Sequence, residues 1–257
     1  MAVPTMYRRI LTVLEGRTID LGHMRLLTSG SDRLPVETFD AIQRQLGHRV
    51  VERYGMTETG IMLSNPVTGD RIAGEVGIPL PGVEMRVTGP ETGMECGDDQ
   101  VGELHTRGPH VFAGYWRDRK KTARSFTGDG WFRTGDLGRR KPNGRFELKG
   151  RMNDTIITGG FNVYPTEVEH VLARHSDVDE CSVVGIPDPE WGEAVVAFVV
   201  SASGAVRESD LIRHCRTSLA GYKTPKRIIM AESLPRNAMG KIRKDSLAQK
   251  LGAKANS

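Results

Sequence analysis

Short strands punctuated by glycine, in the middle of the chain, constrain the fold more than any other feature. Between Gly74 and Gly150, brief runs of β-forming residues end again and again at glycine or proline. Runs of this kind are typical of antiparallel sheets, and the segment KPNGR adds a clear hairpin turn. The region therefore predicts antiparallel β-structure, in the form of a small barrel, with strands that include GVEMRVTG, GELHTRG and GRFELKG.

Strands and helices alternate before this region. The first residues, MAVPTMYRRILTVLEG, read as an amphipathic helix, and LPVETFDAIQRQLG has apolar residues at helical spacing before Gly47. Two short apolar runs, MRLLTSGS and HRVVERYG, read as buried strands that enter loops. A strand, a helix and a second strand in this order predict part of an α/β layer.

The last part of the chain has a different pattern. TEVEHVLARH and ESDLIRHCRTSLAG are predicted helices, and CSVVGI, EAVVAFVVS and RIIMAE are predicted strands. A segment of roughly 100 residues with both element types can form a compact α+β domain. We therefore expect a larger part at residues 1–150, a hinge at 151–154 and a smaller domain at 155–257.

Composition narrows the function classes. Of 257 residues, 38% are apolar and 26% charged, which is ordinary for a soluble protein. The net charge of +4, spread along the chain with only 6% aromatic residues, favours phosphorylated small molecules over nucleic acid. Three widely spaced cysteines predict reduced thiols and a cytoplasmic location. No apolar run reaches membrane-spanning length, and charged residues interrupt the N-terminus where a signal peptide would be apolar.

The segment ERYGMTETG offers several groups for a nucleotide. Tyr54 has an aromatic face, Gly55 and Met56 bring backbone N–H groups, Thr57 a hydroxyl and Glu58 a carboxylate. Such a set could stack a base, bond phosphate oxygens and hold Mg²⁺, which takes oxygen ligands. On chemistry alone, a helix start with Thr57 as its N-cap is at least as good an interpretation.

Three further motifs are each open to two interpretations. In GWFRTGDLG, Asp136 could bond two ribose hydroxyls or be an ordinary turn aspartate. In GRMNDTIITGGFNVYPTEVE, Arg151 could bind ribose or phosphate and Gly159-Gly160 could admit a ligand, or the segment could be a linker and a hairpin. In PRNAMGKIRK, Lys241 follows a glycine in a polar loop and could be catalytic or a surface lysine.

Taken in order, these motifs resemble one superfamily. RYGMTE, GYW, GWFRTGD, GRMND, GGFNVYPTEVE and PRNAMGKI are similar to successive signatures of the adenylate-forming enzymes, which include acyl-CoA synthetases, luciferases and nonribosomal-peptide adenylation domains. The resemblance runs from Ala2 to about Leu251. Within the superfamily, VPTMYRRI, MRLLTSGSDRLP, VERYGMTETG and LPRNAMGKI most resemble malonyl-CoA synthetases.

The resemblance implies a fold and a two-step reaction. Residues 1–150 would be the C-terminal portion of a large AMP-binding domain, with an α/β layer and a small β-barrel-like subdomain, and 155–257 its mobile α+β domain. An acid, ATP and Mg²⁺ would give an acyl-adenylate, from which coenzyme A would take the acyl group. The small domain would rotate between the steps about Asn153, where most relatives have Lys or Asp.

The resemblance also implies residue roles. Lys241 would bridge acid and phosphate, supplying charge as a compact flexible cation. The remaining roles are Tyr54, Gly55 and Met56 at the nucleotide, Thr57 at phosphate, Glu58 at Mg²⁺, Asp136 and Arg151 at ribose, Ser31 at the nucleotide and the acid, and Gly159 and Gly160 on the coenzyme A path.

The identity of the acid depends on Arg9. The second carboxylate of malonate needs a partner, arginine pairs with carboxylates bidentately, and Arg9 and Ser31 match the acid-site positions of malonyl-CoA synthetases. Arg8 and Arg9 could instead be a solvated helix face. Methylmalonate, propionate-like, fatty and aryl acids remain alternatives, because fold does not fix substrate.

One family signature is missing. Relatives carry a Ser/Thr/Gly-rich phosphate loop ending in Pro-Lys-Gly, and no segment here matches it. We therefore expect the chain to correspond to the C-terminal half of such an enzyme, with the N-terminal half of its large domain as a missing partner. A truncated nucleotide-binding remnant without turnover is the alternative.

Overall fold

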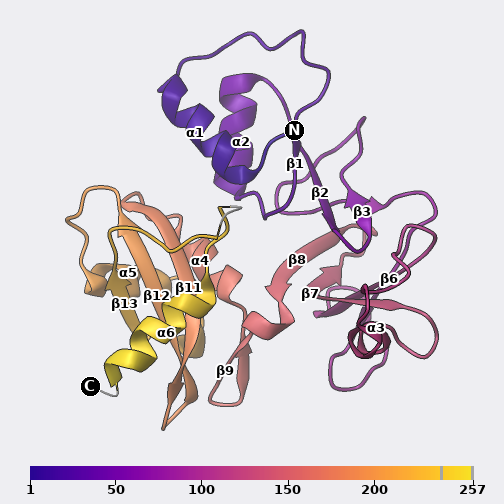
Figure 1. Cartoon of the computed structure of the whole chain (residues 1–257). Helices are drawn as coiled ribbons and strands as arrows, with labels where there is room; N and C mark the ends of the chain where they lie inside the picture. Colours follow the sequence, from indigo (N-terminus) through magenta and orange to yellow (C-terminus); the bar gives the residue numbers. More distant parts are fainter. Residues whose placement is uncertain (238–239, 256–257) are drawn as a thin grey trace. The chain divides into compact units, whose positions relative to one another are not determined.

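The computed structural model describes residues 1–237 and 240–255 and divides into two compact units (Figure 1). The N-terminal unit is Met1–Lys149 and the C-terminal unit is Gly150–Ser257. The division falls next to the segment GRMND, in which sequence analysis placed the hinge.

The first layer of the N-terminal unit packs two helices beside a small sheet. Its strand order is β1-β2-β3-β4, with β1 parallel to β2 and the others antiparallel. Gly47 ends the second helix with a φ of +66°, and its N–H donates to the carbonyl of Gln43, so the predicted C-cap is confirmed. The elements are α1 (Pro4–Leu14), β1 (Thr28–Ser29), α2 (Val36–Leu46), β2 (Val51–Met56), β3 (Gly60–Ser64) and β4 (Ile78–Pro79).

The core of this layer explains its sequence pattern. Tyr7, Leu34, Phe39, Ile42 and Val50 are buried together, and they include the helical-period positions of α2. The segment MRLLTSGS differs from its prediction, because only Thr28 and Ser29 pair as a strand.

The glycine-rich middle forms the predicted antiparallel structure. Its four strands have the order β5-β6-β7-β8, and the hairpin KPNGR joins the last two, with Gly144 at a φ of +76°. Val87, Leu104 and Phe146 pack with Met62 and Leu63 of the first layer. The elements are β5 (Glu84–Thr88), β6 (Gly102–Arg107), α3 (Arg119–Ser125), β7 (Phe132–Arg140) and β8 (Phe146–Arg151).

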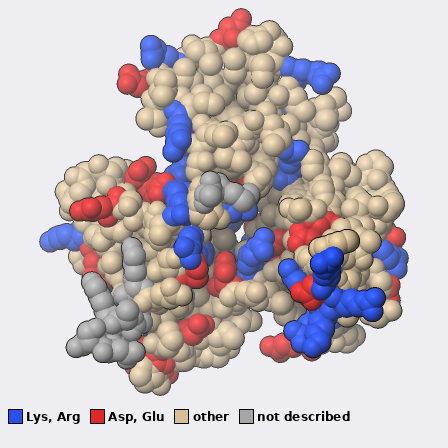
Figure 2. Space-filling model, in the orientation of Figure 1, with Lys and Arg blue, Asp and Glu red and all other residues tan. Residues whose placement is uncertain are grey.

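Basic side chains gather around α3, at the lower right of the space-filling view (Figure 2). Sequence analysis expected no such concentration. The residues that contribute are Arg117, Arg119, Lys120, Lys121 and Arg124. Trp116, immediately before them, is 86% exposed, so an aromatic ring and several cations share this surface.

The C-terminal unit has the predicted α+β composition. Its sheet has the order β10-β9-β12-β11, with β13 parallel to β12. The elements are η1 (Met152–Asp154), β9 (Ile156–Thr158), β10 (Phe161–Val163), α4 (Pro165–Leu172), β11 (Val178–Asp188), β12 (Gly192–Ser201), α5 (Glu208–Arg216), η2 (Gly221–Lys223), β13 (Arg227–Met230) and α6 (Lys244–Ala255).

Strand β12 is buried on both faces, which explains its unbroken apolar run. Val195, Ala197 and Val199 face one cluster with α4 and α5, whereas Val196 and Phe198 face another that Leu247 of α6 completes. Helix α6, which begins shortly after the PRNAMGK segment, packs on this second face of the sheet. No helix among the described residues is long and apolar enough to cross a membrane.

Candidate functional site

The segment ERYGMTETG is a β-hairpin. Strands β2 and β3 pair on either side of a turn at residues 57–59, so the interpretation of Thr57 as a helix N-cap is wrong. Thr57 lies exposed at the tip of this turn. A tight turn between two strands holds its backbone N–H groups in fixed directions, which suits a phosphate.

Gly55 is required by the hairpin itself. The ladder shifts register at Gly55, and a Cβ there would lie 2.0 Å from the carbonyl oxygen of Gly60. Any side chain at this position would push the two strands apart. The glycine therefore sets the close approach that forms the turn carrying Thr57 and Glu58.

Glu58 is held by a tyrosine from a distant motif. The hydroxyl of Tyr115 donates to Glu58 Oε1 at 3.0 Å, and the N–H of Phe112 donates to the Glu58 carbonyl at 2.8 Å. Burial and the bond to Glu58 raise the pKa of Tyr115, so the phenol stays protonated as a donor. Sequence analysis quoted GYW as a signature but gave Tyr115 no role.

The donor set at this turn fits Mg²⁺ bound together with a nucleotide. Mg²⁺ usually takes one or two carboxylates and completes its shell with phosphate oxygens and water. Glu58 supplies a carboxylate, and Thr57, the residue before it, supplies a hydroxyl. Among the described residues no group of three His, Cys, Asp or Glu side chains could hold a metal by itself.

Asp136 lies next to Tyr54, although 82 residues separate them. The Tyr54 hydroxyl donates to Asp136 Oδ2 at 2.6 Å, and each residue is only 8% exposed. Asp136 belongs to strand β7, so its expected place in a turn is wrong. The short bond fixes the direction of the carboxylate, which a group that recognises ribose hydroxyls needs.

The two acid-site candidates lie on separate segments of the N-terminal unit. Arg9 is exposed on α1, on the side that also exposes Met6 and Val13. Ser31 is exposed in the loop after β1 and has a φ of +70°, an uncommon conformation for serine. Such a backbone outlier is typical of a functional loop.

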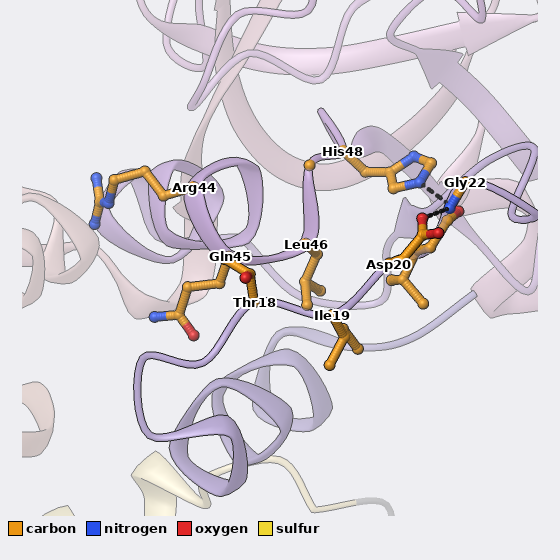
Figure 3. A pocket seen from close by; sticks show the side chains of 10 residues that line it. Thr18, Ile19, Asp20, Gly22, Arg44, Gln45, Leu46 and His48 are labelled. Atoms are coloured by element: carbon orange, nitrogen blue, oxygen red, sulfur yellow. Dashed lines mark hydrogen bonds between the residues drawn. The ribbon is translucent and has the colours of Figure 1, made fainter.

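A cavity of about 330 Å³ in the same unit is lined by residues 18–22 and 44–48 (Figure 3). Its walls come from the segment after α1 and from the end of α2, and His48 Nε2 contacts the Leu21 carbonyl at 3.0 Å beside it. None of the motif residues lines this cavity, and we assign it no role.

In the C-terminal unit, Gly159 and Gly160 form a two-residue hairpin turn between β9 and β10. Their φ values are +56° and +80°, so the interpretation of this segment as a hairpin is confirmed. The Gly159 N–H donates to the Trp191 carbonyl at 2.8 Å, and a Cβ at Gly159 would lie 3.2 Å from the Trp191 ring. Arg151 ends β8 exposed, and Asn153 lies in η1.

Lys241 is exposed on a loop whose ends are tied together. Its N–H donates to Asn237 Oδ1 at 3.0 Å, and its carbonyl accepts from the Asn237 N–H at 2.9 Å. Arg236 and Ile242 form an isolated bridge just outside this pair, and Gly240 has a φ of +80°. Ala238 and Met239 lie outside the described residues.

Known proteins resemble both units of this chain. The AMP-binding enzyme profile matches residues 1–116, and the profile of the AMP-binding enzyme C-terminal domain matches residues 167–241. The chain is 38% identical over 282 residues to the mitochondrial malonate–CoA ligase of Mus musculus, covering 98% of this chain and 48% of the relative. It is 40% identical to the sulfoacetate–CoA ligase of Cupriavidus necator, covering 94% and 47%.

Among solved structures, ATP-bound MatB from Rhodopseudomonas palustris matches with a TM-score of 0.93 and 44% identity, over 97% of this chain and 50% of that one. The chain therefore belongs to the adenylate-forming superfamily of AMP-binding enzymes, and its fold is that of their C-terminal part. The resemblance found in the sequence is confirmed. The chain spans about half the length of the curated relatives it matches.

Proposed function

We propose that this chain carries the nucleotide-binding half of an ATP-dependent acid–CoA ligase that forms an acyl-adenylate and then an acyl-CoA. The observation that carries the proposal is the Tyr54–Asp136 bond beside the YGMTE hairpin, in a chain that two AMP-binding profiles match. A buried carboxylate that is oriented by a tyrosine could bind ribose hydroxyls, and the tight turn of the same hairpin, with Thr57 exposed, could bind phosphate.

In the first step an oxygen of the acid bonds to the α-phosphorus of ATP, and the bond to pyrophosphate breaks. Thr57 binds phosphate oxygens, Asp136 and Arg151 orient the ribose, and Lys241 supplies positive charge to the acid and the phosphate. Tyr54, with Gly55 and Met56, forms the nucleotide side of the site. Mg²⁺, held by Glu58, would neutralise phosphate charge when bound.

In the second step the sulfur of coenzyme A bonds to the acyl carbon and AMP leaves. The Gly159-Gly160 hairpin supports a place for this thiol arm, because two glycines leave the backbone open to close approach. Trp191, which contacts Gly159 of the hairpin, is paired with a cation: the Lys226 ammonium lies 4.0 Å from the centre of the Trp191 ring. We propose that residues 155–257 change position between the steps about Asn153.

The names of the relatives suggest a class of acid. Malonate and sulfoacetate each carry a carboxylate and a second anionic group one methylene away, and ligases for both are about equally identical to this chain. We infer that the substrate is a short acid of this kind, with malonate as the first choice. Arg9, with Ser31 beside the acid, is the proposed partner of the second anion.

The test joins this chain to the N-terminal half of MatB and measures acid-dependent ATP–pyrophosphate exchange. We expect exchange with malonate and weaker exchange with propionate, and Arg9→Ala should lower the malonate activity more than the propionate activity. If no acid supports exchange although the fusion is folded, the ligase proposal is wrong. If Arg9→Ala lowers the two activities equally, Arg9 is not the partner of the second anion.

A binding remnant without turnover is the second candidate, because the chain spans about half of its relatives. It is tested with the chain alone. The remnant predicts ATP binding without acid-dependent exchange, whereas a self-sufficient ligase would show both.

A further inference from the structure

Strand β7 carries a bulge at the position of Asp136. His105 pairs with Arg133 and Glu103 pairs with Leu137, so one residue of β6, Leu104, stands opposite three residues of β7. A bulge of this kind breaks the ladder and redirects side chains. Asp136 is the last of the three, and its direction toward Tyr54 therefore depends on what holds the bulge.

Side chains replace the lost ladder bonds within the bulge. The Thr134 hydroxyl donates to the Leu104 carbonyl at 2.7 Å and accepts the Asp136 N–H at 3.1 Å. Gly135, with a φ of +71°, donates its N–H to Glu103 Oε1 at 3.2 Å. Glu103 thus binds the residue directly before Asp136.

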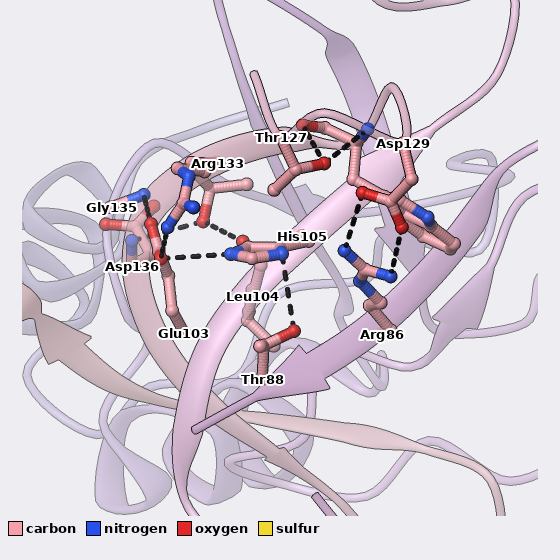
Figure 4. Close-up of polar contacts among 12 residues, drawn as sticks. Arg86, Thr88, Glu103, Leu104, His105, Thr127, Asp129, Arg133, Gly135 and Asp136 are labelled. Atoms are coloured by element: carbon pink, nitrogen blue, oxygen red, sulfur yellow. Dashed lines mark hydrogen bonds and ion pairs between the residues drawn. The ribbon is translucent and has the colours of Figure 1, made fainter. Parts of the chain in front are cut away.

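Glu103 is buried and is held in turn (Figure 4). It is 4% exposed, and its Oε2 lies 2.9 Å from His105 Nε2 and 3.6 Å from an Arg133 nitrogen. Burial alone would raise the pKa of Glu103, but hydrogen bonds from His105 and the Gly135 N–H, together with the charge of Arg133, lower it. The carboxylate is therefore ionised, a stronger acceptor for the Gly135 N–H than a neutral acid.

His105 connects this carboxylate to the next strand. It is 1% exposed, and its Nδ1 lies 3.2 Å from the Thr88 hydroxyl. With Nε2–H donated to Glu103, Nδ1 accepts from Thr88, so one tautomer satisfies both contacts. A cavity of about 250 Å³, lined by Thr88, Glu103, His105 and Arg133, opens beside the chain of bonds.

We propose that Glu103, held by His105, is a positioning residue that aims Asp136 at the ribose of the nucleotide. The inference rests on the proposed function, in which Asp136 binds the ribose hydroxyls of the nucleotide. Glu103 acts only through the Gly135 N–H and touches no substrate. Its loss should therefore remove recognition of the ribose hydroxyls and leave the base and phosphate contacts in place.

The first experiment measures the affinity of the full chain for ATP and for 2′,3′-dideoxy-ATP. Two hydroxyl–carboxylate bonds should make wild-type protein prefer ATP by roughly tenfold or more. We expect Glu103→Leu to reduce the preference to about twofold or less by weakening ATP alone, and Glu103→Gln, which keeps an acceptor for Gly135, to retain most of it. Glu147→Leu is the matched control, since it removes a partly buried carboxylate of the same sheet that is ion-paired with Arg139 and Lys149.

The variant Asp136→Ala distinguishes a failure of the ribose role of Asp136 from a failure of the positioning role of Glu103. If it leaves the preference intact, or wild-type protein has none, the ribose role of Asp136 is wrong. If Asp136→Ala abolishes the preference and Glu103→Leu does not, the positioning role of Glu103 is wrong. Equal losses for both nucleotides in Glu103→Leu would also overturn it, because they indicate general damage.

A second measurement, made without any ligand, tests whether Glu103 holds the Gly135 N–H. Amide hydrogen exchange at Gly135 should be at least tenfold faster in Glu103→Leu than in wild-type protein, while exchange elsewhere in β5 and β6 is unchanged. Unchanged exchange at Gly135 would overturn the inference, whatever the nucleotide affinities show.

Discussion

The candidate residues of the two units are held in different ways. In the N-terminal unit, side chains from distant segments fix them: Tyr54 bonds Asp136, and Tyr115 bonds Glu58. In the C-terminal unit, Lys241 is exposed, and its own backbone N–H and carbonyl bond the side chain and the backbone of Asn237 at the base of its loop. A group that orients a nucleotide must already point in the right direction, whereas a cation needed in one of two steps benefits from a long, exposed side chain.

Substitution of Lys241 should have the largest effect. If the substitution had no effect, the contrast drawn between the two units would be wrong. In the fusion with the N-terminal half of MatB, Lys241→Ala should lower adenylate formation by on the order of 10²- to 10³-fold, because the phosphate loses its cation. Thioester formation from supplied acyl-adenylate should stay within a few-fold of wild type. Single-turnover assays of each half-reaction provide the measurement.

The matched control is Lys244→Ala. Lys244 lies three residues further on, and its ammonium bonds Glu169 at 2.8 Å. Its loss should affect stability and neither half-reaction. Equal losses in both half-reactions for Lys241→Ala would contradict the assignment of that lysine to the first step.

The next effect tests whether the N-terminal site is as rigid as its contacts indicate. Gly55→Ala places a methyl group 2.0 Å from the Gly60 carbonyl oxygen and should cost about 3 kcal/mol of unfolding free energy. Gly60→Ala, with φ at +62° and no atom within 4 Å of the new methyl, should cost only about 1 kcal/mol from backbone strain. Urea unfolding measures the loss of unfolding free energy in each variant. Equal losses would mean that the two strands can separate at Gly55 at little cost, so that the hairpin is not rigid.

A buried carboxylate makes the stability of the N-terminal unit depend on pH. Glu52 is 3% exposed, and burial raises its pKa from 4.5 to about 7, although N–H groups of Gly74 and Leu34 and the charge of Arg33 oppose the shift. The folded state therefore binds more protons than the unfolded state between these values. Stability should fall as pH rises from about 4.5 to about 7, by roughly 3 kcal/mol at most.

Glu52→Gln isolates this contribution, because glutamine does not titrate. The variant should lose the fall in stability between pH 4.5 and pH 7, as measured by urea unfolding at several pH values. A wild-type profile that rises over this window, or a variant with the same slope as wild type, would refute the role of Glu52.

The motifs of the candidate site could be recognised in the sequence, but the contacts that place their residues could not. Tyr54, Glu58 and Asp136 stand in recognisable motifs, but their partners are far along the chain: Tyr115 is 57 residues from Glu58, and Glu103 is 32 residues before Gly135. A motif read locally cannot show a register shift, so the turn expected for Asp136 and the helix start offered as the alternative for Thr57 are both wrong. The fold was predicted better, because strand and helix periods are local properties.

The smallest effect tests one such distant contact. Tyr115→Phe removes the hydroxyl that donates to Glu58 but keeps the ring, which packs 4.9 Å from Phe112 and 3.6 Å below the Lys121 ammonium. One lost hydrogen bond should cost about 1 kcal/mol, or roughly fivefold in the Mg²⁺ concentration needed for nucleotide binding. Tyr7→Phe, which removes a bond to the Thr28 carbonyl, should leave that concentration unchanged. Because both variants lose one tyrosine hydroxyl, a shift confined to Tyr115→Phe would show that Glu58 is aimed by its partner, as Asp136 is by Tyr54.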